Sequence, residues 1–286
     1  MISDAIRKRL RRLNRAVVRA RFPSAVPHKP GPPGTRAVPG AADTFMGAGE
    51  PLNGREVDSP GGKFLLIDRR ASQVLRRGQD LVREYSYYFE GGAAVPEESA
   101  SVDLVRFVQL GPRKSIFLDI ETTGLGGSPL FLVGLLLYHG HELFLRQLFA
   151  RDYSEEKPLL QYLLDLLGKF ELVVTFNGKA FDIPYIKDRC SFNLLPYRLE
   201  FHHLDLLHEY RRRWRNILPD CRLLTLESRI CCRDRVDDIP GRDIPGAYHD
   251  FVRTGDARQI KDILYHNALD LLTMSELVLR LFGSET

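Results

Sequence analysis

The sequence predicts an α/β protein in which a mixed β-sheet is flanked by helices. Three apolar runs, 115–120, 130–138 and 143–149, have the length of buried strands, and their close succession favours an antiparallel meander. A leucine stripe over 155–167 then recurs at helical spacing, and a fourth buried strand follows at 172–176. Strands, a helix, a further strand and then several helices are the order expected of such a sheet.

Local signals predict the remaining elements. A turn at Pro60-Gly61-Gly62 predicts short strands between residues 54 and 68, and 71–83 is expected to be helical although Gly78 weakens that helix. Ser154 is the predicted N-cap of the leucine-rich helix. The later part of the chain is expected to be mainly helical, over about 183–190, 204–214, 224–230 and 256–281, the last with a possible break.

Basic charge is concentrated at the N-terminus. The chain has 286 residues and a net charge of +4, but residues 1–40 carry ten Lys or Arg and one acid, whereas 41–286 carry 31 basic and 36 acidic residues. Apolar residues at helical spacing within 2–21 predict a basic amphipathic helix, followed by a flexible linker rich in Pro and Gly. We therefore expect three parts: a helix and linker over 1–50, a small N-terminal extension or extra strands over 51–110, and the main domain over 111–286.

The sequence leaves three kinds of partner open for the predicted basic helix: the phosphate backbone of a nucleic acid, an anionic membrane surface, or a groove of a partner protein. Its Arg-rich composition also resembles a transit peptide, whereas no apolar segment of a secretory signal follows it. The longest apolar run, 130–138, is too short to span a bilayer, so no transmembrane segment is expected. Four cysteines without a disulfide or zinc pattern predict free thiols and a cytoplasmic location.

The chemistry centres on an acidic pair at the end of the first apolar strand of the meander. Asp119 and Glu121 are two residues apart, so in a strand they project from the same face. Two like charges side by side repel, and a cation removes that cost. Carboxylate oxygens are hard ligands that suit Mg²⁺ or Mn²⁺. Gly124 then allows the backbone to turn closely past the site.

Three motifs extend this pair into a family resemblance. Asp119-Ile-Glu121-Thr-Thr-Gly-Leu125 resembles the first motif of the DEDD exonuclease superfamily, which has a ribonuclease-H-like fold. Asn177-Gly-Lys-Ala-Phe-Asp182 resembles the second motif, and Tyr265-His-Asn-Ala-Leu-Asp270 stands where the third should fall. The stretch from about 115 to 283, more than half of the chain, resembles the YprB-like ribonuclease-H-like domain of bacterial proteins.

The resemblance implies a metal-dependent nuclease with a ribonuclease-H-like fold. In such families four acids, here Asp119, Glu121, Asp182 and Asp270, bind two divalent cations, Mg²⁺ or Mn²⁺, for an in-line phosphoryl displacement. It also implies 3′→5′ exonuclease action on single-stranded DNA or RNA. The alternatives are a structure-specific endonuclease and a non-catalytic nucleic-acid-binding or scaffold module. The presence of all four acids argues against the non-catalytic module. Asp182 also stands where a helix N-cap is expected, a role compatible with ligation.

The third motif departs from both subgroups of the superfamily. One subgroup places a His five residues before the last Asp and the other places a Tyr four residues before it. Here Tyr265 is five and His266 four residues before Asp270. Four residues advance a helix about 40° beyond one turn and five about 140°, so His266 shares the face of Asp270 better. We therefore predict that His266 orients or deprotonates the attacking water, with Tyr265 as the alternative.

Five residues of the first two motifs are predicted to bind the substrate. The resemblance implies that Thr122, Thr123 and Leu125 contact the terminal nucleotide. Asn177 and Lys179 belong to the second motif, and Lys179 is either a phosphate contact or simply exposed.

Three further segments lie near the motifs or carry charge. Asp205 is expected to cap a helix or to support the acids, and His202-His203 is expected to be structural or close to the substrate. The basic run 211–215 includes Trp214, the only tryptophan. It either follows a phosphate backbone, with Trp214 stacked on a base, or forms a solvated helix face with Trp214 in the core.

Overall fold

The computed structural model describes residues 52–75, 77–90 and 101–282, which belong to one compact unit. The predicted basic helix and linker, residues 1–50, lie outside the described residues. In the described part, no helix is both long and apolar enough to cross a membrane. All four cysteines lie in that part and carry free thiols.

One mixed sheet organises the fold. Its strands are β1 (Arg55–Ser59), β2 (Gly62–Arg70), β3 (Ser115–Thr122), β4 (Leu130–His139), β5 (Glu142–Phe149), β6 (Leu172–Thr175) and β7 (His202–Asp205). Their order is β1-β2-β5-β4-β3-β6-β7. β3, β4 and β5 form the predicted antiparallel meander, and β6 and β7 continue the sheet beyond β3 in parallel. The predicted fold class is therefore confirmed.

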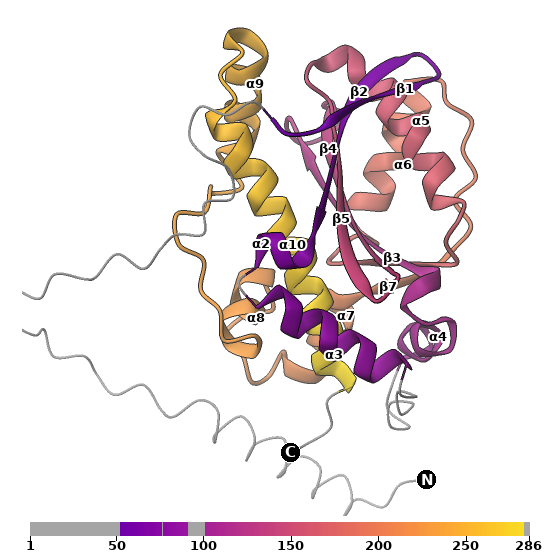
Figure 1. The fold of residues 1–286 in the computed structure, drawn as a ribbon, viewed down its shortest axis with the longest axis vertical. Helices are drawn as coiled ribbons and strands as arrows, with labels where there is room; N and C mark the ends of the chain where they lie inside the picture. Colours follow the sequence, from indigo (N-terminus) through magenta and orange to yellow (C-terminus); the bar gives the residue numbers. More distant parts are fainter. Residues whose placement is uncertain (1–51, 76, 91–100, 283–286) are drawn as a thin grey trace, which may run out of the picture. The chain divides into compact units, whose positions relative to one another are not determined.

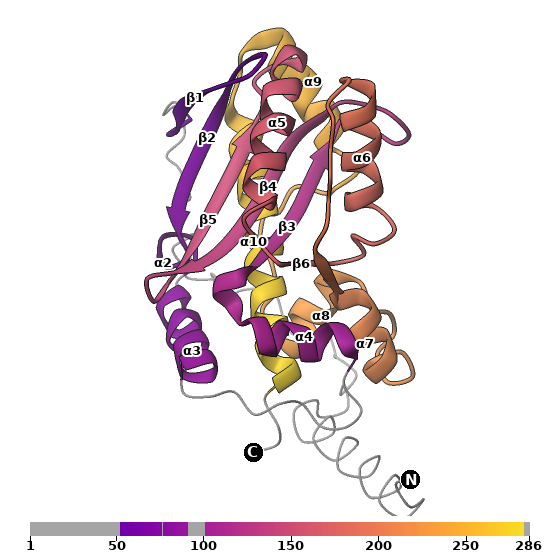
Figure 2. The same cartoon turned by 90° about the vertical axis from the view of Figure 1, so that its right-hand side faces the viewer.

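Helices cover both faces of this sheet. The leucine-rich α5 (Glu156–Leu167) and α6 (Asp182–Phe192) lie on one side, and the long α10 (Arg258–Phe282) crosses the other, as Figures 1 and 2 show. The remaining helices are α2 (Ala71–Val74), α3 (Gly78–Glu90), α4 (Val102–Leu110), α7 (Leu206–Trp214), α8 (Leu223–Ile230) and α9 (Ile244–Thr254).

Alternation along β3 decides which side chains face α10. Ile116 and Leu118 belong to the buried cluster that contains the leucines of α5. Phe117 belongs to the second cluster, together with residues of α10. Successive side chains of a strand point to opposite faces, so Asp119 and Glu121 continue the series of Phe117 toward α10. The predicted acidic pair thus lies where strand and helix meet.

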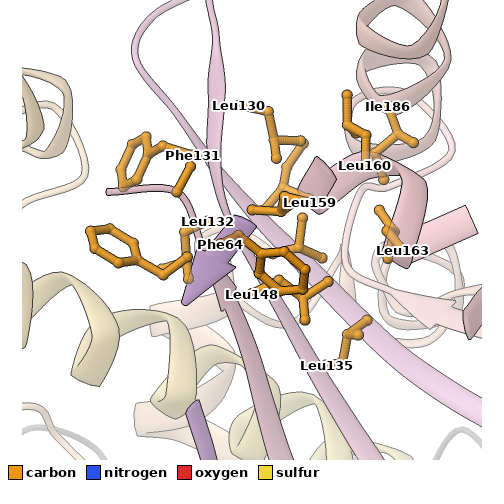
Figure 3. Packing of buried hydrophobic residues seen from close by; sticks show 14 of the residues in the cluster. Phe64, Leu130, Phe131, Leu132, Leu135, Leu148, Leu159, Leu160, Leu163 and Ile186 are labelled. Carbon is orange, nitrogen blue, oxygen red and sulfur yellow. The ribbon is translucent and has the colours of Figure 1, made fainter. Parts of the chain in front are cut away.

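The packing beneath α5 is shown in Figure 3. Leu159, Leu160 and Leu163 form the predicted leucine stripe and share a buried cluster with Phe64 and Leu148 of the sheet. None of these five side chains is exposed to solvent. Burial of each such side chain contributes about 1.5–3 kcal/mol, so this helix is held mainly by its apolar face.

The segment after residue 51 adds strands to the main sheet. Gly61 and Gly62 turn the chain between β1 and β2 with φ angles of +95° and +142°, which glycine adopts readily. β2 pairs antiparallel with β5, and Arg146 binds both carboxylate oxygens of Asp68 across these strands, at 2.8 and 2.9 Å. β1 and β2 thus extend the main sheet beyond β5.

Two predictions about helix bounds were wrong. The helix expected over 71–83 is divided into α2 and α3, because the backbone is extended at Leu75, with a φ of −110° and a ψ of 133°. Gly78 then begins α3 so close to α2 that a Cβ there would lie 2.4 Å from the Ala71 carbonyl oxygen. Ser154 does not cap α5. A short 3₁₀ turn (Tyr153–Glu155) precedes that helix, and the Asp152 side chain accepts the Ser154 N–H at 2.8 Å.

The structure differs from the sequence predictions in three further places. The helix expected from residue 204 begins at Leu206, because His202–Asp205 pairs with β6 as an edge strand. Helices α4 and α9 had no predicted counterpart. The last helix begins at Arg258 and continues to Phe282 without a break.

The contribution of β2 to the main core gives a first prediction. Leu66 is 1% exposed. We expect Leu66→Ala to lower the free energy of unfolding of the whole unit by about 3 kcal/mol, because the change removes buried methyl groups and leaves a cavity. Denaturant titration followed by circular dichroism measures this. Asp58→Ala on β1, where the side chain is 86% exposed, is the control and should shift that free energy by less than about 0.5 kcal/mol. An unchanged midpoint for Leu66→Ala would contradict the role of β2 in the core.

Candidate active site

Three elements far apart in the sequence bring the four predicted acids together. Asp119 and Glu121 lie on β3, Asp182 begins α6, and Asp270 lies on α10. Burial raises the pKa of Asp119 well above its ordinary value, and the charges of Asp270, Glu121 and Asp182 raise it further. Because Coulomb interactions weaken with distance, these mutual effects place the four carboxyl groups in one cluster.

The same cluster perturbs two more of its members. Burial raises the pKa of Glu121 to about 8, an increase that the charge of His266 opposes and that of Asp270 supports. Burial also raises the pKa of Asp182 to about 7, although hydrogen bonds from backbone N–H groups counteract it. Carboxyl groups with pKa values near neutrality, gathered on three elements, favour the binding of a cation.

The second motif forms a turn that Asp205 holds in place. The Asp205 carboxylate accepts the N–H groups of Asn177 and Lys179 at 2.9 and 3.0 Å, and it caps α7 by accepting the Leu207 N–H at 3.1 Å. Asn177 has a left-handed backbone with a φ of +66°. Asp205 was expected to cap a helix or to support the acids, and its contacts show a helix cap that also fixes the turn of the second motif.

Asp182 enters the cluster from the first turn of α6. Its predicted N-cap role is wrong, because Phe181 is the N-cap and Asp182 the first helical residue. The side chain is only 4% exposed, and backbone N–H groups of Asp182 itself and of Ile120 on β3 hydrogen-bond to it and lower its pKa. The contact with Ile120 joins the second motif directly to the strand that carries the first.

The turn after β3 is held by its own hydroxyl groups. Thr122 Oγ1 donates to the Gly124 carbonyl at 2.9 Å. The N–H and Oγ1 of Thr123 both donate to the Pro129 carbonyl, at 2.9 and 3.2 Å. These bonds leave Leu125 at the tip of the turn, where it is 84% exposed. Of the three residues of this motif predicted to bind substrate, Leu125 therefore presents the most accessible side chain.

A buried ion pair braces this turn from α6. Arg189 binds the Glu156 carboxylate through Nε and Nη2, both at 2.6 Å, and the two side chains are 3% and 4% exposed. Arg189 Nη1 also donates to the Gly127 carbonyl, and Glu156 accepts the Leu130 N–H at 2.8 Å. Tyr185 donates to two further carbonyl groups of the turn. The helix that carries Asp182 thus also fixes the turn beside Glu121.

His266 lies on the acidic side of α10. Its Nδ1 donates to Asp238 at 2.9 Å, and its Nε2 is 3.6 Å from Asp270 Oδ2. Burial lowers the pKa of His266, but the hydrogen bond to Asp238 and the charges of Asp270 and Glu121 outweigh that effect and raise it. Tyr265 packs instead against the hydrophobic cluster under α10. The helical geometry that favoured His266 over Tyr265 agrees with this arrangement.

One cation of the cluster was not predicted. Arg235, in the loop between α8 and α9, donates to Asp270 through Nη2, to Asp238 at 3.1 Å and to Glu227 at 2.7 Å. Its side chain is 5% exposed. Arg235 thereby holds Asp270 directly and His266 through Asp238. The sequence offers little signal for it, because a loop has no periodicity, and only the dense alternation of Arg and Asp over 233–238 marks the segment.

A cavity adjoins this loop. It has a volume of about 520 Å³ and is lined by His266, Arg235, Asp238 and Leu224 among others. Its wall contains both acids and arginines, and Arg233 is itself paired with Glu227 at 2.5 Å. The cavity therefore adjoins the acid cluster through His266 without forming a separate charged site.

The donor set of the cluster fits a divalent cation. Its oxygens belong to carboxyl groups that are mutually repulsive and partly desolvated, which is the chemistry that hard divalent cations favour. Protein donors already engage part of the set: Asp119 Oδ2 accepts from Asn267 at 2.8 Å, Asp270 Oδ1 accepts from Arg235, and backbone N–H groups hydrogen-bond to Asp182. Among the residues that the structure describes, no three His, Cys, Asp or Glu side chains already stand in a metal-binding arrangement. Ligation by three acids therefore requires their side chains to turn.

The other sequence candidates have structural contacts. His203 Nε2 lies 2.8 Å from Thr175 Oγ1, and burial lowers the pKa of His203 to about 4. Lys179 pairs with Asp103 of α4 at 2.7 Å. Trp214 stacks on Tyr210 with ring centroids 4.7 Å apart, which supports the interpretation that it packs against the core.

Comparison with known families identifies the domain. Residues 116–282 match the family model of the RNase H superfamily, a match that covers more than half of the chain and contains all four acids. The chain belongs to the RNase H superfamily. The mixed sheet and the order of the three motifs agree with this assignment, and the predicted ribonuclease-H-like fold is confirmed. Membership in the RNase H superfamily supports a nuclease-type function with nucleic acid as the substrate.

The individual matches to this RNase H superfamily chain align with only part of it, and the aligned segment is also only part of each matched protein. The uncharacterized protein YprB of Bacillus subtilis (strain 168) is 34% identical over 170 residues, which are 58% of this chain and 41% of YprB. DNA polymerase 1 of Sulfurisphaera ohwakuensis is 24% identical over 159 residues, 52% of this chain and 17% of the polymerase. The structure of the family B DNA polymerase from Pyrobaculum calidifontis aligns with a TM-score of 0.47 and 15% identity, over 57% of this chain and 24% of that one. The chain thus spans less than half the length of these relatives.

The raised carboxyl pKa values predict how stability depends on pH. Glu121 and Asp182 keep protons in the folded chain up to pKa values of about 8 and about 7, whereas their ordinary values are 4.5 and 3.8. The stability that these protonated groups contribute at low pH is therefore lost as the pH rises through their pKa values in the folded chain. The raised pKa of His266 acts in the same direction. One pKa unit is about 1.4 kcal/mol and 1 kcal/mol moves Tm by roughly 2–4 °C, so we expect Tm in EDTA to fall by at least about 5 °C between pH 5.5 and 8.5.

Thermal unfolding followed by circular dichroism measures this dependence. Glu121→Gln removes one of the titrating groups and should flatten the curve, whereas Asp165→Asn, an exposed acid of α5, should leave it unchanged. Adding Mn²⁺ should raise Tm most at the alkaline end, where the acids are ionised. A Tm in EDTA that is constant or rises over this range would show that the acids do not destabilise the folded state.

Proposed function

We propose that this chain is a metal-dependent nuclease that hydrolyses the phosphodiester bonds of single-stranded DNA or RNA from the 3′ end. The observation that supports this most directly is the cluster of Asp119, Glu121, Asp182 and Asp270, contributed by three elements and coupled electrostatically. We further propose that these acids hold two divalent cations, Mg²⁺ or Mn²⁺. Such cations, when bound, neutralise the carboxylates and the charge that develops on the phosphate during an in-line displacement.

His266 is the proposed residue that orients the attacking water or accepts its proton. Its Nδ1 hydrogen is committed to Asp238, so in the neutral ring Nε2 is the nitrogen that accepts. Nε2 faces the acid cluster, 3.6 Å from Asp270 Oδ2. Arg235 supports this arrangement because it holds both Asp238 and Asp270. Tyr265 remains the alternative, although it packs against the hydrophobic cluster under α10.

The substrate contacts follow from the two turns beside the acids. We propose that the exposed Leu125 packs against the terminal base, with Thr122 and Thr123 shaping its turn. Asn177 and Lys179 would contact the sugar-phosphate backbone, for which Lys179 must exchange its partner Asp103. The 3′ polarity rests on the family resemblance, and the ribonuclease-H-like scaffold also supports structure-specific endonucleases.

A nuclease assay tests the proposed function. Incubated with single-stranded DNA or RNA labelled at the 5′ end, the wild-type chain should shorten the substrate from the 3′ end with Mn²⁺ or Mg²⁺ and not with EDTA. An Asp119→Ala, Asp182→Ala double variant should show background activity, because it loses half of the carboxylates. Asp165→Asn, an exposed acid of α5, is the matched control and should retain wild-type activity.

The outcomes of this assay separate the candidate functions. Internal cuts that require Asp119 and Asp182 would keep the site and replace exonuclease by endonuclease action. Activity that survives in the double variant would show that another site or a contaminant hydrolyses the substrate. Retained binding without hydrolysis by the wild type would favour the non-catalytic module.

The role of His266 gives a separate prediction. His266→Ala should lower kcat by about 10²-fold or more, the range that a positioned general base contributes, while Tyr265→Phe should change it less than about threefold. The pH dependence of kcat/KM for the wild type should contain an ionisation that disappears in His266→Ala. The reverse ranking of the two variants would assign the role to Tyr265.

A further inference from the structure

Three residues form a row across neighbouring strands beneath α10. β3 pairs Asp119 with Gly134 of β4, and β4 pairs Gly134 with Gln147 of β5. Residues paired across a sheet point to the same face, so the row faces the helix that covers that side. Asn267 of α10 lies directly over it. Asp119, Gly134 and Gln147 are thus aligned under Asn267.

The Asn267 side chain bridges the two ends of the row. Its Nδ2 donates to Asp119 Oδ2 at 2.8 Å, and its Oδ1 accepts from Gln147 Nε2, also at 2.8 Å. Gln147 Nε2 donates in addition to the Leu264 carbonyl of α10, at 2.7 Å. Asn267 is 0% and Gln147 2% exposed. Because water cannot replace a lost partner in so buried a place, these bonds hold both amides in fixed orientations.

Gly134 makes room for this bridge. A Cβ atom on Gly134 would lie 2.0 Å from Asn267 Oδ1 and 2.6 Å from its Nδ2. Real Cβ atoms essentially never approach other atoms within 3.0 Å, so any other residue at 134 would displace the amide. Gly134 does not have a positive φ angle. The position therefore requires glycine for space and not for backbone conformation.

The seating of Asn267 on Gly134 also sets how α10 lies against β3. One residue along a helix corresponds to a rise of about 1.5 Å and a rotation of about 100°, so fixing one residue fixes where its neighbours point. His266 precedes Asn267, and Asp270 follows it by nearly one turn. The charges of Asp119 and Asp270 repel each other and act to separate strand from helix. The bond from Asn267 to Asp119 opposes that separation.

We propose that Asn267 is a positioning residue for the acid cluster. By holding one oxygen of Asp119 and seating α10 on Gly134, it sets the separation between the strand that carries Asp119 and the helix that carries Asp270, and shared ligation of a divalent cation depends on that separation. Gly134 and Gln147 act through Asn267, the first by clearing space and the second by fixing the orientation of the amide. This inference rests on the proposed metal-dependent function.

Calorimetric titration of the full chain with Mn²⁺ tests the proposal. Asn267→Ala should weaken Mn²⁺ binding about tenfold or more, which is the range found when residues that orient metal ligands are replaced. Ser275→Ala is the matched control, because Ser275 is also 0% exposed on α10 but its side-chain hydroxyl donates only to the Leu272 carbonyl of the same helix, and the change should alter the affinity less than twofold. Each titration is made at a temperature at which circular dichroism shows the variant folded.

Gly134→Ala provides the second arm. In the wild-type background its Cβ displaces the Asn267 amide and should weaken Mn²⁺ binding about as much as Asn267→Ala does. Combined with Asn267→Ala, the same Cβ occupies the space that the amide has left. The double variant should therefore have a higher Tm than Asn267→Ala alone, and it should bind Mn²⁺ no more weakly than Asn267→Ala does. If Asn267→Ala alone fails to fold, the double variant is the protein on which the affinity is measured.

The possible results separate this inference from the proposed function. Wild-type Mn²⁺ affinity in folded Asn267→Ala, or in the double variant, overturns the positioning role and leaves the metal site intact. Losses of affinity that add independently for Gly134→Ala and Asn267→Ala overturn the claim that Gly134 acts through Asn267. Absence of Mn²⁺ binding in the wild type overturns both the inference and the proposed metal-dependent function.

Discussion

Repulsion between carboxyl groups is the constraint on which the rest of this structure depends. Two like charges about 4 Å apart repel by roughly 4 kcal/mol at an effective dielectric constant of about 20, and a whole domain is stable by only about 5–15 kcal/mol. Four acids from β3, α6 and α10 nevertheless share one partly buried cluster, and burial and mutual charge raise the pKa of three of them. Stabilising contacts around the cluster must therefore hold these elements together.

Each acid-bearing element is held by a polar contact outside the cluster or at its edge. Asp205 holds the turn that leads to Asp182, and the buried Arg189–Glu156 pair holds the turn beside Glu121. Asn267 ties β3 to α10 through Asp119. Arg235 supplies positive charge at Asp270 and is itself fixed by Asp238 and Glu227. Because Arg235 contacts the same carboxylate as the proposed divalent cation would, binding of that cation and the position of the loop that carries Arg235 would be physically linked.

The parts of the fold that the sequence predicted are those encoded locally. The meander of β3, β4 and β5 and the leucine stripe of α5 follow from periodicities of two and 3.6 residues. The four acids were found because each lies in a short motif. β7 was missed because four residues containing two histidines and an aspartate give no strand pattern, and pairing with β6 decides their conformation. The division of 71–83 at Leu75 was not predicted, because the only local signal, Gly78, stands three residues later, at the start of α3.

The contacts that complete the site depend on registers between distant segments. Asn267, Gly134 and Gln147 meet only because β3, β4 and β5 pair in one particular register under α10, and a single sequence contains no signal for that register. Arg235 reaches Asp270 from a loop, where side-chain direction follows from the whole path of the chain. Short motifs thus mark the candidate acids, while the side chains that contact these acids are brought to them by the tertiary fold.

The central claim is that the four acids form a binding site for divalent cations. The most direct test is the crystal structure of the chain grown with Mn²⁺, with diffraction data collected at the manganese absorption edge. The account predicts anomalous peaks in contact with the carboxylates of Asp119, Asp270 and at least one of Glu121 and Asp182, with Asn267 still bound to Asp119. An ordered site in which these carboxylates keep only protein partners, with no anomalous peak beside them at saturating Mn²⁺, would contradict it.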